Sequence, residues 1–177
     1  MSKLSNRQRF ELGFVLVISA LVVLAALAAG RFDFVSGNRA IALYDKRYTP
    51  EQVRFSTGDR FEGDWAVLPN GLRLAPGQSG SVTIRVKNEP ESQLVVLLDG
   101  RRGSGFRWSV SVSGDGNAFR TVARNVPLDH TRTDLTASVA HFASVWIKFS
   151  AAGDGSASGL EPAELSRVRV VALQSPM

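Results

Sequence analysis

The feature that most constrains this chain is an apolar stretch near its N-terminus. From Leu12 to Ala29 the only polar side chain is that of Ser19. At about 1.5 Å per residue, a helix of this length reaches roughly 27 Å, close to the hydrocarbon thickness of a bilayer. The core helix of a soluble protein usually keeps one polar face, which this stretch lacks. We therefore predict a transmembrane helix over residues 12–29.

The charges before this stretch predict its orientation. Lys3, Arg7 and Arg9 precede it, and Glu11 is the only acidic residue there. A short basic segment stays on the cytoplasmic side of a membrane. Residues 1–11 are therefore predicted to be a cytoplasmic tail, and the rest of the chain to be periplasmic or extracellular.

A cleaved signal peptide is the competing interpretation of the same stretch. Ala26-Leu27-Ala28 resembles a signal-peptidase site. The apolar region of a signal peptide usually spans about 7 to 15 residues, and this one is longer, which favours a retained signal anchor. Both interpretations predict export of the body of the protein.

Charge and composition narrow the classes of partner. The formal net charge is +5, but beyond residue 30 basic and acidic residues are mixed along the chain. Such a distribution is typical of a solvated surface, so nucleic acid is not a predicted partner. The chain has no cysteine. Disulfides, thiolate catalysis and thiolate-bound zinc are therefore excluded.

Residues 30–64 are predicted to be a stalk between the membrane helix and a folded domain. One short helical turn is expected in it, because Thr49 can cap a helix, Pro50 suits its first turn and Gln52 occupies the capping-box position. The folded domain is predicted over residues 65–177.

That domain shows the period of β-strands. Arg107 to Val112 alternates so that Trp108, Val110 and Val112 share one face, which predicts a core position for Trp108. Other β-type runs are Trp65–Leu68, Leu72–Leu74, Ser81–Lys87, Gln93–Leu98, Phe119–Val122, Leu135–Val139, Ser144–Phe149 and Val168–Leu173. No helical pattern between them is long enough for a βαβ crossover. An all-β antiparallel sandwich is therefore predicted.

Two passages resemble a known family. FRWSVSVSGDG from Phe106 to Gly116, followed by a strand at Phe119–Val122, resembles the "strand, Asp-Gly turn, aromatic, strand" passage of galactose-binding-like (discoidin-type) jelly rolls. Val145–Phe149, a Gly/Ser loop and Leu165–Val170 are similar to that family's last two strands. The resemblance covers roughly Trp65 to Leu173 and implies a jelly roll that binds carbohydrate, in some members with a structural calcium ion. Ligand residues of that family lie on variable loops, so none is carried over to a numbered position.

The residues predict no catalytic or metal site, and the protein is not expected to be an enzyme. His130 and His141 are too few and too poorly spaced for a metal site, and no serine lies in a nucleophile elbow. Asp115-Gly116-Asn117 and Asp154-Gly155 place oxygen ligands in turns, which makes a structural calcium ion an alternative to the absence of any cofactor. Asp-Gly is more often a plain turn sequence.

The first candidate ligand site is the segment from Asp99 to Gly105. It is predicted to be a mobile loop between two strands, with Asp99, Arg101 and Arg102 available to sugar hydroxyls or to acidic polysaccharide. The alternative is an ordinary solvated hairpin loop.

The second candidate is Trp146 with Lys148. Alternation places Val145, Ile147 and Phe149 on the inner face and leaves Trp146 and Lys148 on the outer one. An outward tryptophan can stack on a sugar ring or dock a neighbouring subunit, and it can equally be covered by the stalk.

Two functions follow as hypotheses. The first is a non-catalytic, membrane-anchored module that binds glycan or envelope polysaccharide, which the family resemblance favours. The alternative is a structural accessory subunit that braces a larger membrane protein complex, which the lack of a recognisable cleft motif favours.

Overall fold

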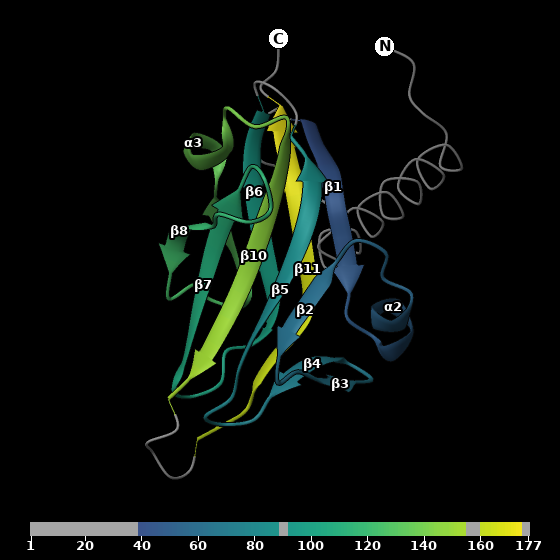
Figure 1. Ribbon diagram of the computed structural model, residues 1–177, viewed down its shortest axis with the longest axis vertical. Helices are drawn as coiled ribbons and strands as arrows, with labels where there is room; N and C mark the ends of the chain where they lie inside the picture. Colours follow the sequence, from purple (N-terminus) through teal and green to yellow (C-terminus); the bar gives the residue numbers. More distant parts are fainter. Residues whose placement is uncertain (1–38, 89–91, 155–159, 175–177) are drawn as a thin grey trace, which may run out of the picture. The chain divides into compact units, whose positions relative to one another are not determined.

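The computed structural model describes residues 39–88, 92–154 and 160–174, which form two facing β-sheets (Figure 1). The six-stranded sheet contains β1 (Arg39–Arg47), β3 (Ala66–Leu68), β4 (Gly71–Leu74), β6 (Ser92–Arg101), β9 (Asp129–Asp134) and β11 (Ala163–Gln174). The five-stranded sheet contains β2 (Arg60–Gly63), β5 (Ser79–Lys87), β7 (Phe106–Ser113), β8 (Arg120–Arg124) and β10 (Ser144–Gly153). Two short helices, α2 (Pro50–Arg54) and α3 (Thr136–Val139), lie between strands.

The strand order explains how the chain builds two layers. One sheet runs β3-β4-β11-β6-β9, with β1 also paired to β11, and the other runs β2-β5-β10-β7-β8. Every strand pair given by the register is antiparallel. From β4 onward most connections cross from one sheet to the other, which is the strand order of a double-sheet jelly roll. The predicted antiparallel sandwich is confirmed.

The core lies between the two sheets, where the predicted alternation places it. Val145, Ile147 and Phe149 of β10 are fully buried and belong to the same core cluster as Trp108 of β7. The Trp108 side chain is 1% exposed. Because successive residues of a strand point to opposite faces, Trp146 must then point outward. The predicted assignment of inner and outer faces is confirmed.

The stalk prediction is wrong from residue 39 onward. β1 pairs with β11 along its whole length, from Arg39 opposite Gln174 to Arg47 opposite Arg167. The compact unit that holds the sandwich begins at Asn38 and not at residue 65. The sequence of β1 misleads because its apolar residues, Ala40–Tyr44, are consecutive and are followed by three charged residues, so apolar and polar residues do not alternate.

The predicted helical turn is confirmed as α2. Thr49 is its N-cap, and the Thr49 Oγ1 accepts a hydrogen bond from the backbone N–H of Gln52 at 3.3 Å. Pro50 occupies the first turn, where its missing N–H costs nothing.

Two neighbouring segments differ from the predicted strand pattern. The run predicted as a strand at Leu135–Val139 contains helix α3, because Leu135 and Val139 are both 1% exposed and their spacing of four residues suits one helical face. Asp134 starts this helix by accepting the Thr136 N–H at 2.9 Å. The preceding segment, for which no strand was predicted, is the edge strand β9, which pairs with β6.

Several predictions concern residues outside the described ranges. These are the cytoplasmic tail at 1–11, the membrane helix at 12–29 with its alternative cleavage site, and the first part of the stalk at 30–38. The membrane anchor and the side of the membrane therefore stay predictions. Neither of the helices in the described ranges has the length and apolar character needed to cross a membrane.

Candidate functional site

A shallow hollow of about 640 Å³ lies at one end of the sandwich, beside the β6–β7 loop. Its lining comes from that loop, from the start of β7, from the residue after β8 and from the residue after β10. The lining residues are Arg102, Gly103, Ser104, Gly105, Phe106, Arg107, Asn125 and Asp154.

A second hollow of about 330 Å³ shares Arg107 and Asn125 with the first and extends it over β7 and β8. Its other lining residues are Trp108, Ser109, Thr121, Arg124 and Ala152. We call the two hollows together the arginine groove.

The arginine groove is strongly cationic. The guanidinium groups of Arg102, Arg107 and Arg124 form no ion pair or hydrogen bond with any residue of the described ranges. Among the described lining residues, Asp154 is the one acidic residue, and it already interacts with another group. A guanidinium presents its N–H groups in a planar fork that matches carboxylate, sulfate and phosphate oxygens. The groove is therefore suited to an anionic ligand.

Hydrogen bonds hold the β6–β7 loop in place. The indole N–H of the buried Trp108 donates to the backbone carbonyl of Arg102 at 3.0 Å. The Asp154 N–H donates to the Gly105 carbonyl at 2.9 Å, and the Glu161 N–H donates to Ser104 Oγ at 2.7 Å. Because these bonds exist without a ligand, the groove needs little ordering on binding.

An unusual backbone conformation brings β8 to the groove. Asn125 has φ of 55° and is the one non-glycine residue in the described ranges with positive φ. Asparagine tolerates this conformation better than most residues. The next residue, Val126, donates its N–H to the Trp108 carbonyl at 3.1 Å, which ties the chain after β8 to β7.

The structure separates the residues predicted in the first candidate site. Arg102 lines the groove, but β6 continues through Arg101, so the predicted mobile loop from Asp99 is wrong in extent. Asp99 is 8% exposed in the six-stranded sheet, with its carboxylate 3.6 Å from the guanidinium of Arg169. It lines a different hollow of about 400 Å³ together with Arg47. Arg101 is an exposed residue of the same sheet, opposite Glu164 of β11.

Trp146 lies on the outer face of the five-stranded sheet, as predicted, but its ring is not open. The guanidinium carbons of Arg60 and Arg85 lie 4.7 Å and 5.5 Å from the ring centroid. The backbone of Gly116 also lies against the indole, since a Cβ there would come within 2.8 Å of it. One predicted alternative was that residues 30–64 cover the Trp146 ring, and Arg60 of β2, which lies in that range, does cover part of it. The ring is thus a support for two arginines.

Lys148 lies on the same outer face and is neutralised. Its Nζ is 2.7 Å from the carboxylate of Glu62 and 5.6 Å from the ring centroid of Phe119. The hydrogen bond from Lys148 lowers the pKa of Glu62, with a further hydrogen bond from Ser81. Lys148 is therefore less available to a ligand than Arg60 or Arg85.

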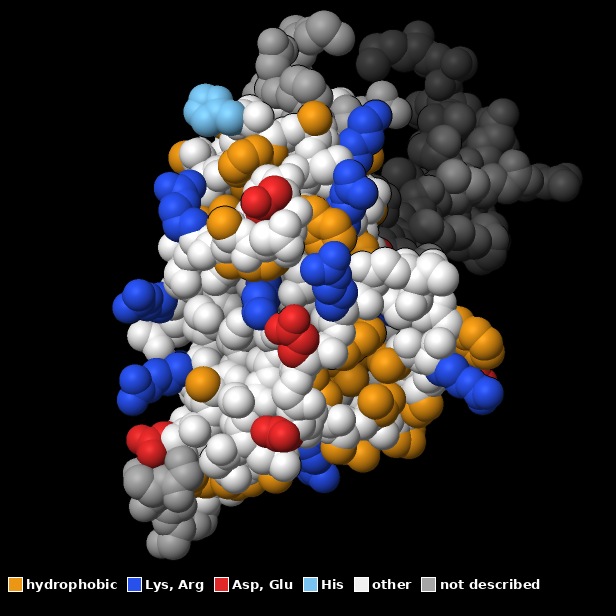
Figure 2. All heavy atoms as spheres, in the orientation of Figure 1, with side chains coloured by type: hydrophobic (Ala, Val, Ile, Leu, Met, Phe, Trp, Pro, Cys, Tyr) orange, Lys and Arg blue, Asp and Glu red, His pale blue; other side chains and the backbone are white. Residues whose placement is uncertain are grey.

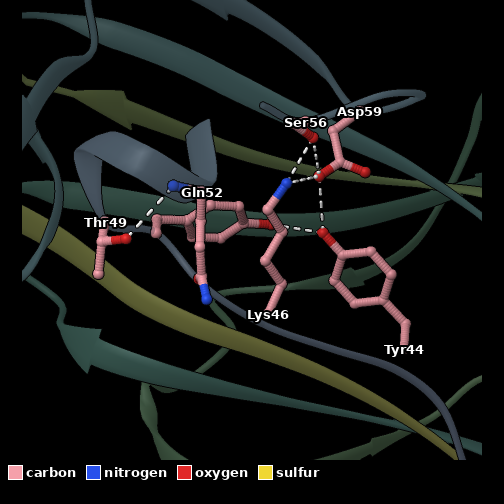
Figure 3. A network of polar contacts seen from close by, with 7 residues as sticks. Tyr44, Lys46, Thr49, Gln52, Ser56 and Asp59 are labelled. Carbon is pink, nitrogen blue, oxygen red and sulfur yellow. Dashed lines mark hydrogen bonds and ion pairs between the residues drawn. The ribbon is translucent and has the colours of Figure 1, made fainter. Parts of the chain in front are cut away.

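A polar network at the edge strand β1 is a further cluster of chemically capable side chains (Figure 3). One carboxylate oxygen of Asp59 accepts hydrogen bonds from Lys46 Nζ at 2.7 Å, Ser56 Oγ at 2.7 Å and Tyr44 Oη at 2.8 Å. Lys46 Nζ also donates to Ser56 Oγ. A lysine that activates a serine must be free to take up a proton, whereas Lys46 Nζ is held in an ion pair with Asp59 at 2.7 Å. We interpret the network as structural.

Titration of the tyrosines tests the burial of this network. Tyr44 and Tyr48 are the two tyrosines of the chain, and burial raises the pKa of both phenols. We expect ultraviolet titration to detect little phenolate in the folded protein at pH about 10, where unfolded tyrosines are half ionised. Because the folded pKa values exceed the unfolded ones, the stabilisation that comes from burying the two neutral phenols is complete below pH about 10. It is lost as the pH rises further toward the folded pKa values. Equal titration curves with and without urea would contradict the prediction.

The first candidate calcium turn, at Asp115, is closed by hydrogen bonds to the Asp115 carboxylate. Asp115 Oδ1 accepts hydrogen bonds from Ser113 Oγ at 2.7 Å and from the backbone N–H groups of Asn117 and Ala118 at 2.9 Å and 3.0 Å. These bonds, with that from Ser113 the strongest, lower the pKa of Asp115 to about 2. The Asp115 carboxylate therefore stabilises the turn in which it lies. Gly155, after Asp154, lies outside the described ranges. Elsewhere in those ranges, no three acidic or histidine side chains cluster as metal ligands would.

Sequence reasoning did not identify Arg107, Arg124 or Asn125 as groove residues. The alternation of β7 does place Arg107 on the outer face, which is a usable signal. Arg124 joins it only through the pairing of β7 with β8, where Ser109 lies opposite Arg124. That pairing includes a register shift, which short-range patterns do not reveal.

Comparisons with known proteins give distant likenesses. No family model matches the chain, and no curated protein matches it. Among solved structures, the chain is similar to TmCBM61 in complex with β-1,4-galactotriose, with 12% identity, a TM-score of 0.39, and cover of 72% of this chain and 94% of that one. It is similar to an exo-β-1,3-galactanase from Phanerochaete chrysosporium, with 18% identity, a TM-score of 0.37, and cover of 77% and 30%.

A third solved structure is tailspike protein 4 of bacteriophage CBA120, with 11% identity, a TM-score of 0.30, and cover of 82% of this chain and 20% of that one. The chain thus spans almost all of the first structure but less than a third of the other two. With all three TM-scores below 0.5, these likenesses do not assign a function to the chain.

Proposed function

We propose that this jelly roll is a non-catalytic module that binds an acidic glycan in the arginine groove. The observation that carries the proposal is the set of three guanidinium groups, those of Arg102, Arg107 and Arg124, which no described carboxylate neutralises and which line the two adjoining hollows of the arginine groove. Unneutralised charges gathered in a hollow attract an anion more strongly than the same charges spread over a surface.

The other lining residues favour a sugar over a small inorganic anion. Ser104, Ser109, Thr121 and Asn125 add hydroxyl and amide groups that can bind sugar hydroxyls. Trp108 lines the groove but is 1% exposed, so it offers no ring face for stacking. Recognition therefore depends on charge and hydrogen bonds, which favours a glycan with carboxylate groups over a neutral one.

Calorimetric titration of the full chain, kept in solution with a detergent that has no sugar headgroup, tests this function. We expect a trimer of galacturonic acid to bind, and a neutral galactose trimer to bind at least about tenfold more weakly. Arg107→Ala combined with Arg124→Ala should weaken trigalacturonate binding by about tenfold or more, because a hydrogen bond to a charged group contributes about 1.5 to 3 kcal/mol.

The matched control is Arg54→Ala combined with Arg101→Ala. These two exposed arginines lie outside the groove, so the change in net charge is the same while the groove is intact. We expect the control to retain the affinity of the parent protein. Equal weakening in both double variants would show that net charge alone attracts the ligand and would refute a groove site.

A second function, that of an accessory subunit in a protein complex, is favoured by one different observation. The Phe55 side chain is 74% exposed and that of Val67 is 41% exposed, in elements α2 and β3 that contact each other. Figure 2 shows hydrophobic side chains gathered at that margin of the molecule. Loss of a co-purifying protein on Phe55→Ser, with trigalacturonate binding absent from the parent, would favour this alternative.

A further inference from the structure

A second cationic cluster lies on the same face as part of the arginine groove. Arg60 of β2 and Arg85 of β5 flank the Trp146 ring on the outer face of the five-stranded sheet. Neither guanidinium pairs with a carboxylate in the described ranges, and Arg85 donates only a long hydrogen bond, 3.5 Å, to Ser144 Oγ. We call Arg60, Arg85 and Trp146 the arginine–tryptophan cluster.

Strand register relates the cluster to the groove. In the pairing of β10 with β7, Trp146 lies opposite Ser113 and Ala152 lies opposite Arg107. All four side chains belong to the outward set, because the residues that alternate with them are core residues. Ser113 is six positions beyond Arg107 along β7, which at about 3.3 Å per residue is a distance of roughly 20 Å.

The surface between the two positions is mostly polar, and Lys148, which is paired with Glu62 and lies over the Phe119 ring, is the one long side chain of β7 and β10 there. The intervening outward residues are Ser109 and Ser111 on β7 and Ser150 and Lys148 on β10. Figure 2 shows this face with basic side chains distributed over it, a few acidic and hydrophobic side chains among them, and white side chains and backbone between them. The small side chains leave room for a chain-like ligand.

The acidic residues near this face are already engaged. Glu62 is paired with Lys148 at 2.7 Å. Asp115 accepts hydrogen bonds within its own turn. The free positive charges at the two ends are therefore not offset by free negative charges of the described residues between them.

We propose that the ligand is a linear polyanionic polysaccharide that lies along β7 and β10, with one part in the arginine groove and another on the arginine–tryptophan cluster. This inference rests on the proposed function of the groove. Cation–π contact with the Trp146 ring holds the two guanidinium groups, so that Arg60 and Arg85 lose little further side-chain freedom when they bind a ligand. Contact at both clusters makes the second contact intramolecular, which raises affinity without any new type of interaction.

The same chemistry argues for a polysaccharide over a single-stranded nucleic acid. Binding of single strands without sequence preference uses aromatic rings on which bases stack. On this face the Trp146 ring is occupied by two arginines and by Gly116. The hydroxyls of Ser109 and Ser150 between the clusters suit sugar hydroxyls instead, whereas the buried Ser111 bonds Thr121.

Affinity as a function of chain length tests the inference. Calorimetry on the full chain would use galacturonate oligomers from three to about ten residues, with a single-stranded oligothymidylate of equal charge as competitor. We expect affinity to rise by about tenfold or more once an oligomer spans roughly 20 Å, and to change little with further length. Arg60→Ala combined with Arg85→Ala should bind long oligomers no more tightly than the trimer, and circular dichroism would verify its fold.

The outcomes separate this inference from the function on which it rests. Groove-dependent binding of the trimer with no gain for longer oligomers would refute the extended ligand and leave the proposed function standing. An undiminished gain in the Arg60→Ala, Arg85→Ala form would also refute it. Absence of binding at every length would refute both proposals. Tighter binding of the oligothymidylate than of the uronate of equal charge would overturn the assignment to polysaccharide.

Discussion

Trp108→Ala is expected to lower the free energy of unfolding by about 3 to 5 kcal/mol, the cost of deleting a large buried aromatic side chain. Trp108 is 1% exposed and packs against Trp65, with ring centroids 6.1 Å apart. Total stability of a domain is commonly about 5 to 15 kcal/mol, so the variant should be close to unfolding. Urea titration of the full chain, followed by far-ultraviolet circular dichroism of the sandwich, measures the loss.

The same substitution should also affect the arginine groove. Trp108 holds the Arg102 carbonyl at 3.0 Å, so its loss frees the loop that carries the Arg102 guanidinium. Trp108→Phe keeps much of the apolar volume but not the N–H. We expect it to reduce the free energy of trigalacturonate binding by more than it reduces the free energy of unfolding. The matched control is Trp146→Ala on the outer face, for which we expect a stability loss of about 1 kcal/mol. A larger loss for Trp146→Ala than for Trp108→Ala would contradict the assignment of the two faces.

Asp59→Ala is expected to lower the free energy of unfolding by about 3 to 5 kcal/mol. The side chains of Asp59 and Lys46 are 7% and 16% exposed, and removal of one partner leaves the other charge largely buried without compensation. Tyr44 and Ser56 lose their acceptor as well. The effect should appear as a lower urea midpoint with little change in the slope of the transition.

A surface ion pair provides the comparison. Arg167 binds Asp45 through two hydrogen bonds of 2.7 Å and 2.5 Å, but the two side chains are 28% and 41% exposed. Exposed pairs contribute about 0 to 1 kcal/mol, so Asp45→Ala should have a much smaller effect than Asp59→Ala. Double replacement of Lys46 and Asp59 by Met and Leu should recover part of the loss, because no charge is then buried alone. Equal effects of Asp45→Ala and Asp59→Ala would contradict the structural role of the network.

The amino-acid sequence by itself determined the fold class and the faces of the main strands. Alternation in β5, β7 and β10 separates core from surface residues locally, because side chains of a strand point to opposite sides in turn. Trp108 inside and Trp146 outside followed from that rule alone. The helical turn at α2 also followed, since its cap and its proline act within one turn of chain.

Only the tertiary structure decided which surface residues meet. β1 and β2 are edge strands whose place in the sheets is set by pairing with β11 and β5. Strand order places Arg60 beside Trp146 and places Asp99 and Arg107 in different sheets. Arg124 lies at the groove because of the pairing of β7 with β8, which includes a register shift. In a jelly roll, neighbouring strands are mostly not consecutive in the chain, so the contacts that form a site depend on long-range pairing, about which local residue patterns carry little information.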